Sequence, residues 1–289
     1  MTALGIERSS TPVLPTSTHP PALPPPTWTA RTLAVLGDST TVGIGDPLPG
    51  GRWRGVGPLL AAALGAEVHN VSATGARLGD VRATQLPQAM AVAPDAAVVI
   101  AGMNDTLRSD FDPVAMCADL AHVVISLQER GTVVALVRFH DHARVFRMPA
   151  ALRRALRTRI DRLNSVIDTV VAETGAALVD LDVLPGAYET ATWSVDRLHP
   201  SELGHRMLAK GFAEQLAARG CAVPAPVSLV CEGGLRPGPL AHFAWLVLKG
   251  IPWLCKRGGD LVPYALGIML RGHREPPCGQ LGAERVARP

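Results

Sequence analysis

This sequence has a small net charge, no closely spaced pair of cysteines and no long apolar run. The 28 lysines and arginines against 25 aspartates and glutamates leave a formal net charge of +3 at pH 7, which is too small to indicate nucleic-acid binding through charge alone. Hydrophobic residues make up 47% of the chain and charged residues only 18%, a balance that excludes disorder over most of its length. We therefore expect a globular protein without a nucleic-acid partner.

The five cysteines are odd in number, scattered, and free of any closely spaced CxxC pair. This distribution disfavours a structural zinc site, and it fits a reducing compartment better than an oxidising one. The N-terminal residues also lack the continuous apolar stretch of a secretory signal. We expect a cytoplasmic protein.

No apolar stretch of the chain approaches the ~20 residues that are needed to span a bilayer. The stretches at 243–248 and 265–270 are bounded by lysine, glycine and proline. This excludes a membrane-spanning anchor. Peripheral contact with a membrane surface through residues 240–270, which include Trp245 and Trp253, stays open as an alternative.

Proline is sparse in the middle of the chain, where only nine of the 25 prolines fall in residues 31–219. Because proline lacks a backbone donor, proline-rich segments favour extended conformations over helices and central strands. We therefore predict a flexible leader over 1–30, a folded domain over 31–219 and a helical C-terminal appendage over 220–289. The appendage could pack on the domain, cover the site as a lid, form a dimer contact or lie on a membrane. No oligomeric state is predicted.

From residue 32 onward, short β-prone apolar runs alternate with longer helical stretches. The expected strands are Thr32–Leu36, Glu67–Val71, Ala96–Ala101, Val133–Arg138 and Ala177–Leu181. The expected helices are 55–64, 79–92, 113–130, 150–173 and 201–219. This alternation predicts βαβ units around a parallel sheet, with a site at the C-terminal ends of the strands.

Polar segments follow the first three of these strands. The first strand runs into Gly37-Asp38-Ser39-Thr40, where a serine at a strand-to-helix turn can present its hydroxyl beside helix N-terminal amides. The second is followed by a turn containing Gly75, which permits close approach of a backbone N–H. The third is followed by Asn104, which offers a side-chain amide. Taken singly, each segment is also an ordinary cap or turn.

A fourth polar segment, Asp196-Arg197-Leu198-His199-Pro200, follows the last expected strand. The spacing of three residues lets the carboxylate of Asp196 orient the imidazole of His199 and stabilise its cation. The other ring nitrogen is then free to take a proton from a serine hydroxyl. A cap at the start of the next helix explains this segment alone, but not the other three.

These four segments, in this order, resemble the sequence blocks of the SGNH (GDSL-type) hydrolase family over about residues 31–219. The resemblance implies a three-layer, flavodoxin-like α/β fold whose five-stranded, mostly parallel sheet has the order 2-1-3-4-5. It also implies the roles of five residues: Ser39 as nucleophile, His199 as base, Asp196 as acid, and Gly75 and Asn104, with the Ser39 amide, as oxyanion-hole donors. The first block reads Gly-Asp-Ser-Thr rather than Gly-Asp-Ser-Leu, which leaves this chemistry intact.

The implied activity is ester hydrolysis through an acyl-enzyme, without a metal or organic cofactor. The substrate would be a small-molecule ester, a lipid ester or an acetylated sugar. Three alternatives stay open: an acyltransferase that uses the same site, a noncatalytic scaffold, and a metal-dependent hydrolase. The metal site of the last would be built from Asp196, His199 and His205 with His140 and His142.

Three further residues near the expected site are weaker candidates for substrate binding. His140 and His142 follow the fourth strand, and Trp193 precedes the Asp196–His199 segment. Polar residues are usual in loops, and a tryptophan can equally well be buried beneath the loop. We therefore expect at most a role in specificity for these three.

Overall fold

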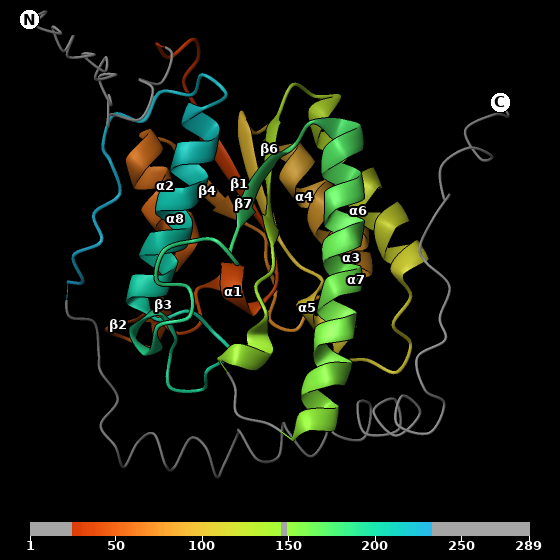
Figure 1. The fold of residues 1–289 in the computed structure, drawn as a ribbon. Coiled ribbons are helices and arrows are strands. Elements are labelled where there is room, and N and C mark those ends of the chain that lie inside the picture. Colours follow the sequence, from red (N-terminus) through yellow and green to blue (C-terminus); the bar gives the residue numbers. More distant parts are fainter. Residues whose placement is uncertain (1–24, 146–148, 233–289) are drawn as a thin grey trace, which may run out of the picture.

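A five-stranded parallel sheet forms the centre of the computed structural model, which describes residues 25–145 and 149–232 (Figure 1). Its strands are β1 (Thr32–Gly37), β4 (Glu67–Asn70), β5 (Ala96–Ile100), β6 (Val133–Arg138) and β7 (Ala177–Asp180). They lie in the order β4-β1-β5-β6-β7, which is 2-1-3-4-5 when the strands of this sheet are numbered along the chain. The predicted order is therefore confirmed, and no strand end differs from its prediction by more than one residue.

Helices cover both faces of the sheet and complete the three predicted layers (Figure 1). One face carries α2 (Val56–Leu64) and α8 (Glu202–Ala217). The other carries α6 (Pro113–Gln128), α7 (Ala150–Thr174) and a stretch composed of α3 (Leu78–Asp80), the π-helical turn η1 (Val81–Gln85) and α4 (Leu86–Ala91). The five long helices expected from the sequence are all present, although the π-helical turn was not foreseen.

Short elements occupy the connections between the long ones. They are α1 (Ser39–Val42), the hairpin strands β2 (Pro47–Leu48) and β3 (Arg52–Trp53), α5 (Met103–Thr106), and the 3-10 turns η2 (His142–Arg144) and η3 (Thr190–Thr192). Sequence periodicity did not predict these elements, because each is shorter than the window over which a period can be recognised.

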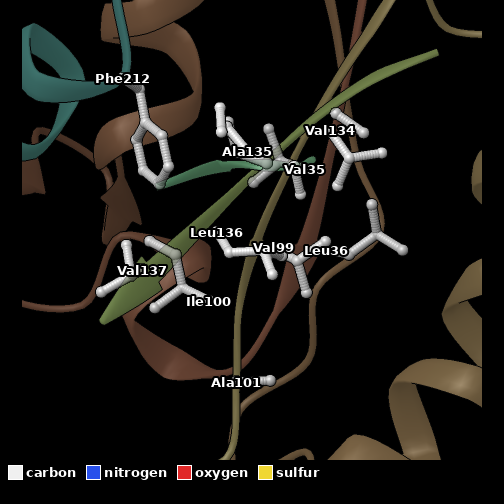
Figure 2. Close-up of a cluster of buried hydrophobic side chains, with 14 of the residues drawn as sticks. Val35, Leu36, Val99, Ile100, Ala101, Val134, Ala135, Leu136, Val137 and Phe212 are labelled. Carbon is white, nitrogen blue, oxygen red and sulfur yellow. The ribbon is translucent and has the colours of Figure 1, made fainter. Parts of the chain in front are cut away.

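The central strands are buried on both faces, as expected for a parallel sheet that lies between two helical layers. All five residues of β5 are buried. Figure 2 shows Val35, Val99 and Leu136 from three neighbouring strands together with Phe212 of α8. Phe212 has no exposed surface, and burial of such a side chain contributes roughly 1.5–3 kcal/mol. This packing holds the C-terminal ends of the strands in place, and the loops that carry the site begin there.

The end of the predicted leader is part of the folded domain, which corrects the boundary at residue 30. The backbone N–H groups of Thr27 and Trp28 both donate to the carbonyl of Gly220, at 2.8 and 3.2 Å. The indole Nε1 of Trp28 donates to the Arg219 carbonyl at 2.9 Å, and Ala30 is buried. The rest of the predicted leader, residues 1–24, lies outside the described residues.

The described part of the predicted appendage, residues 220–232, contains no helix and packs on the domain as an extended segment. The N–H of Ala225 donates to the Ala63 carbonyl at 3.2 Å. Farther along, Arg206 of α8 donates to the Ser228 carbonyl at 3.0 Å and pairs with Glu232 at 2.9 Å. The predicted helical appendage is therefore wrong for these residues. Residues 233–289, including the proposed membrane-contact region 240–270, lie outside the described residues.

Within the described ranges, no helix has both the length and the apolar character that crossing a membrane requires.

Candidate active site

The turn after β1 places Ser39 at the C-terminal edge of the sheet. Gly37 ends the strand at φ +137°, and a Cβ there would lie 2.0 Å from the Ile100 carbonyl oxygen, so only glycine fits. Asp38 then caps α1 by accepting a hydrogen bond from the Thr40 N–H at 2.9 Å. Ser39 is therefore the first residue of α1, and it is partly exposed just beyond the end of β1.

Ser39, His199 and Asp196 form a continuous hydrogen-bonded series. The Oγ of Ser39 lies 2.8 Å from Nε2 of His199, and Nδ1 of His199 lies 2.6 Å from Oδ2 of Asp196. The serine and the histidine are 160 residues apart in sequence. The structure thus brings together three residues that the sequence predicted to meet.

Several donors hold the Asp196 carboxylate in place. Its Oδ1 accepts from the Ser194 hydroxyl at 2.7 Å and from the N–H groups of Leu198 and His199 at 2.9 and 3.0 Å. Burial raises the pKa of Asp196, but the hydrogen bonds and the charge of His199 outweigh burial and lower this pKa to about 2. Because the carboxylate is ionised it accepts from Nδ1–H, which leaves Nε2 as an acceptor for the Ser39 hydroxyl.

The loop that carries Gly75 lies beside the serine turn. Ala73 N–H donates to the Gly37 carbonyl at 3.2 Å, and Asn70 donates from its side chain to the Thr41 carbonyl at 2.8 Å. Gly75 adopts φ +81°, and apart from its own chain neighbours no described atom lies within 4 Å of where its Cβ would be. Within the described ranges, the N–H groups of Gly75 and Ser39 have no hydrogen-bond acceptor, so both are available to an anionic oxygen.

Asn104 connects the two other loops. Its Nδ2 donates to the Ala76 carbonyl at 3.1 Å and lies 3.3 Å from Oδ2 of Asp38. Asn104 therefore lies between the serine turn and the Gly75 loop, where an oxyanion in the site could take over one of the two Nδ2 hydrogens. All five residues expected to perform the chemistry lie on these four joined segments.

Two buried aspartates support this edge of the site. Burial raises the pKa of Asp38 to about 6, against the lowering effects of the Thr40 N–H and of His199. Burial likewise raises the pKa of Asp105. Asp105 accepts hydrogen bonds from the Leu78 N–H and from Nε of Arg77, each at 3.2 Å. It thereby holds the segment that follows Gly75 against the one that carries Asn104.

His140, His142 and Trp193 are buried rather than displayed on the rim, with 2%, 6% and 9% of their surface exposed. His140 lies over the Trp193 ring at a centroid distance of 4.7 Å, and the indole Nε1 donates to the Ala187 carbonyl at 2.7 Å. The three rings therefore pack against one another in the interior. This placement gives no support to the expected contact with substrate.

The residues of the metal-dependent alternative do not form a cluster. Among residues 25–145 and 149–232, no three histidines, cysteines, aspartates or glutamates are arranged to hold a metal ion. His205 instead contacts the Ile44 carbonyl through Nε2 at 3.0 Å. A cavity of about 350 Å³ with several aspartates in its lining lies between the segments that follow Gly75 and Asn104 and the start of α6. Its carboxylates include Asp105 and Asp110, which both pair with Arg77.

Sequence reasoning missed two side chains that shape the site. Gln85 of η1 makes a reciprocal pair with Gly37, accepting from its N–H at 2.7 Å and donating to its carbonyl at 2.9 Å. Arg54 joins the buried Asp46, which follows the serine segment, to Glu202 of α8, at 2.9 and 2.7 Å. In the sequence, Gln85 is notable only because a polar side chain lies on the apolar side of a predicted helix. No sequence pattern indicates the ion pairs of Arg54.

Comparisons with known proteins agree with this geometry. The family model of the GDSL-like lipase/acylhydrolase family matches residues 35–207. No curated protein sequence matches the chain significantly.

Three solved structures illustrate the similarity of fold. LAE5, an alpha/beta hydrolase enzyme from the metagenome of Lake Arreo in Spain, is 23% identical with a TM-score of 0.53, over 66% of this chain and 97% of its own. Axe2, an acetylxylan esterase from Geobacillus stearothermophilus, is 23% identical with a TM-score of 0.51, over 65% of this chain and 94% of its own. TesA is 23% identical with a TM-score of 0.52, over 64% of this chain and 98% of its own. At this identity the likeness establishes the fold alone.

The family match spans more than half of the chain and includes every segment of the site described above. The chain therefore belongs to the GDSL-like lipase/acylhydrolase family and is a carboxylic ester hydrolase.

Proposed function

We propose that this protein hydrolyses small-molecule esters through an acyl-enzyme formed on Ser39. The observation that carries the proposal is the unbroken series from Ser39 Oγ to His199 Nε2 at 2.8 Å and from His199 Nδ1 to Asp196 at 2.6 Å. Both distances are within hydrogen-bond reach, as a nucleophile and its base require.

In the first half of the reaction, His199 Nε2 takes the proton of the Ser39 hydroxyl while Oγ attacks the ester carbonyl carbon. The tetrahedral intermediate collapses when the C–O bond to the alcohol breaks, and the imidazolium returns its proton to the departing alkoxide. Asp196 stays ionised and stabilises the imidazolium. The products of this half are a free alcohol and an acyl group esterified to Ser39.

In the second half, water replaces the serine as nucleophile. His199 takes a proton from the water as it attacks the acyl carbon, and then gives that proton back to Ser39 Oγ as the acyl bond breaks. The carboxylic acid leaves, and the enzyme returns to its starting state. In both halves, the N–H groups of Ser39 and Gly75 and the amide of Asn104 donate to the anionic oxygen.

For the substrate, we propose a short acyl ester on a polar alcohol. Among the structural relatives, Axe2 is described as an acetylxylan esterase. Three of the segments that form the site also present polar side chains, since Thr40, Thr74 and Asn104 are at least partly exposed. A lipid ester is the competing substrate, and the two differ in the length of the acyl chain.

The test uses the full chain, p-nitrophenyl esters of graded acyl length, and an acetylated xylooligosaccharide. We expect kcat/KM to be highest for acetyl or propionyl esters, acetate to be released from the sugar, and Ser39→Ala to abolish both activities. A serine-directed fluorophosphonate should label Ser39 in the folded protein. An optimum at long acyl chains would replace the short-acyl substrate with a lipid. Absence of both labelling and hydrolysis would favour a noncatalytic scaffold.

Acyl transfer is the second candidate, because the same acyl-enzyme can react with an alcohol instead of water. Ser39 and His199 lie at an edge that water reaches, with 19% of the His199 side chain exposed, which favours hydrolysis. Product analysis with and without an added acceptor alcohol separates the two. Ester products formed in preference to free acid would assign the protein as an acyltransferase.

A further inference from the structure

The segment that follows Ser39 is held by the helix that follows His199. The N–H of Ile44 donates to the Ser39 carbonyl at 3.1 Å, and Nε2 of His205 in α8 lies 3.0 Å from the Ile44 carbonyl oxygen. α8 begins at Glu202, shortly after His199. One residue, Ile44, therefore connects the backbone of the nucleophile to the helix that comes after the base.

The contact between His205 and Ile44 is an uncharged hydrogen bond. A carbonyl only accepts, so Nε2 of His205 carries the hydrogen. Burial lowers the pKa of His205 to about 4, so the ring is neutral near neutral pH and its Nδ1 is a bare acceptor. The geometry agrees, because Nδ1 is buried without a hydrogen-bond partner among the described residues. A neutral hydrogen bond has roughly half the strength of a charge-assisted one, so this contact alone is a modest restraint.

The same two segments touch again at Gly45. Its φ is +103°, and a Cβ there would lie 1.9 Å from the Pro200 carbonyl oxygen and 3.1 Å from Cβ of Ser194. The backbone after Ser39 thus packs directly against the residue that follows His199, with no room for a side chain between them. This contact limits how closely the segments approach, but it adds little attraction.

Arg54 supplies a charged bridge between the two segments. Asp46 and Arg54 flank the β2–β3 hairpin. The guanidinium donates to both carboxylate oxygens of Asp46, from Nε at 2.9 Å and from Nη2 at 3.2 Å, and Nη2 also donates to Oε1 of Glu202 at 2.7 Å. The two carboxylates belong to different segments, one after the nucleophile and one after the base. A single planar group therefore joins the two segments.

Burial makes this bridge stronger than a surface ion pair. The Asp46 side chain has no exposed surface, and the side chains of Arg54 and Glu202 are 14% and 13% exposed. Solvent and salt therefore screen these charges much less than they screen an exposed pair. The third partner of Arg54, Glu232, is 70% exposed and contributes little to the bridge.

We propose that Arg54 is a positioning residue, which bridges Asp46 to Glu202 and thereby holds the nucleophile and the base at hydrogen-bonding separation. The proposal rests on the proposed function for its kinetic consequences, but not for its structural one, the hydrogen bond between Ser39 and His199. In the part of the chain that the structure describes, the guanidinium bonds to carboxylates and not to the catalytic pair. It therefore acts through the segments that it joins.

Three variants of the full chain test the proposal. Arg54→Gln removes the bridge. Glu202→Gln weakens the bridge from the α8 side and leaves Arg54 paired with Asp46, so no buried carboxylate loses its cation. Arg206→Gln is the matched control, because Arg206 is 3% exposed and pairs with the same carboxylate of Glu202 at 3.1 Å. The control removes a buried arginine from this cluster without affecting Asp46.

The first readout is the nitrogen NMR chemical shift of His199 Nε2, which changes when this nitrogen loses its hydrogen-bond donor. We expect Arg54→Gln and Glu202→Gln to move this shift towards the value of an unbonded nitrogen. Arg206→Gln should leave it as in the wild type. A merely structural role of Arg54 would lower stability and leave the shift of the folded variant unchanged.

The second readout is steady-state kinetics with p-nitrophenyl acetate, at a temperature at which thermal melts show every variant to be folded. Arg54→Gln should lower kcat about tenfold or more with little change in KM, since small misplacements of reacting groups are costly. Glu202→Gln should also lower kcat, and the double variant should be no slower than Arg54→Gln, because both changes break one bridge. Arg206→Gln should lower the melting temperature but not kcat.

An unchanged Nε2 shift or an unchanged kcat in Arg54→Gln would overturn the proposal, as would an equal loss of kcat in Arg206→Gln. If Arg54→Gln does not fold, the same two readouts on Glu202→Gln, compared with Arg206→Gln, decide the matter. The NMR comparison needs no substrate. If the wild type neither hydrolyses esters nor reacts with a fluorophosphonate, the proposed function fails, and the Nε2 shift still decides whether Arg54 positions the pair.

Discussion

Asn104 contacts two other segments of the site through one side-chain nitrogen, which lies 3.3 Å from Asp38 and 3.1 Å from the Ala76 carbonyl. We expect Asn104→Ala to lower kcat by about 10²–10³, the typical effect of removing one oxyanion donor. The lost hydrogen bonds should cost only about 1 kcal/mol each in unfolding free energy, so the variant should remain folded.

Steady-state kinetics with p-nitrophenyl acetate and a thermal melt check this prediction. Thr74→Ala is the control, because Thr74 is exposed next to Gly75 and supplies no oxyanion donor in the proposed mechanism. If Asn104→Ala retained more than a tenth of the wild-type kcat, Asn104 would not be an oxyanion donor. A collapse of the melt would instead assign it to folding.

Asp38 illustrates the cost of a buried charge at this edge. Burial raises its pKa from 3.8 to about 6, so the folded protein binds this proton more tightly than the unfolded chain does. The contribution of Asp38 to stability is therefore most favourable below pH 4 and declines as pH rises through about 6. The difference between the two pKa values corresponds to roughly 3 kcal/mol.

Urea unfolding of the wild type and Asp38→Asn between pH 4 and 8 measures this effect. Asparagine has no charge to bury, so the unfolding free energy of the variant relative to the wild type should rise by up to roughly 3 kcal/mol from pH 4 to pH 7. The comparison depends on the change with pH and not on any constant offset between the proteins. A difference that stays constant over this range would contradict the raised pKa.

At the scale of elements, the π-helical turn η1 braces the end of β1 through Gln85. Gln85 satisfies both the N–H and the carbonyl of Gly37, and it is 2% exposed. We expect Gln85→Leu to lower the unfolding free energy by about 1–3 kcal/mol, because it leaves the buried N–H of Gly37 without an acceptor. The Gly37 carbonyl loses one of its two donors but still accepts from the Ala73 N–H. It should also lower kcat, since Gly37 precedes Asp38 and Ser39.

Gln88→Leu is the matched control. Gln88 lies one turn farther along the same helical stretch, is exposed, and its side chain donates to the Thr84 carbonyl at 2.8 Å. Equilibrium denaturation of both variants should show a loss confined to Gln85→Leu. Equal effects would mean that leucine perturbs the helix itself and that the pair with Gly37 contributes nothing.

The elements that the sequence predicted well are those with a repeating local pattern. β5 is a continuous apolar run because both of its faces are buried, and α7 shows a regular apolar period. Gln85 and Arg54 have no such pattern, since their partners are 48 and up to 178 residues away. His140 and His142 were expected on the rim because loops after strands are usually exposed. Trp193, from another loop, covers them instead.

At the scale of the whole molecule, composition placed the domain limits only approximately. Proline content marked residue 30 as a limit, yet Thr27 and Trp28 pair with Gly220. Proline content also marked residue 220, yet Cys221 is buried in the core and Glu232 pairs with Arg54 and Arg206. Proline reports which backbone conformations are excluded, but an extended segment can still pack on a domain. The limits therefore follow from tertiary contacts that no local pattern records.

Chains that end at residue 232 or at residue 219 should therefore behave differently. The shorter chain loses Gly220, which accepts from Thr27 and Trp28, together with the Ser228 carbonyl and Glu232 that Arg206 uses. With each hydrogen bond worth ~1 kcal/mol, we expect it to be less stable than the 1–232 chain by at least about 3 kcal/mol. Urea denaturation of the two chains measures the difference, and equal midpoints would return the domain limit to residue 219.

Full-length protein and the 1–232 chain, compared on esters of increasing acyl length, then report what residues 233–289 contribute. A difference in KM between the two proteins that grows with the length of the acyl chain would indicate that residues 233–289 act as a lid or bind lipid. Identical kinetics would show that this segment takes no part in catalysis.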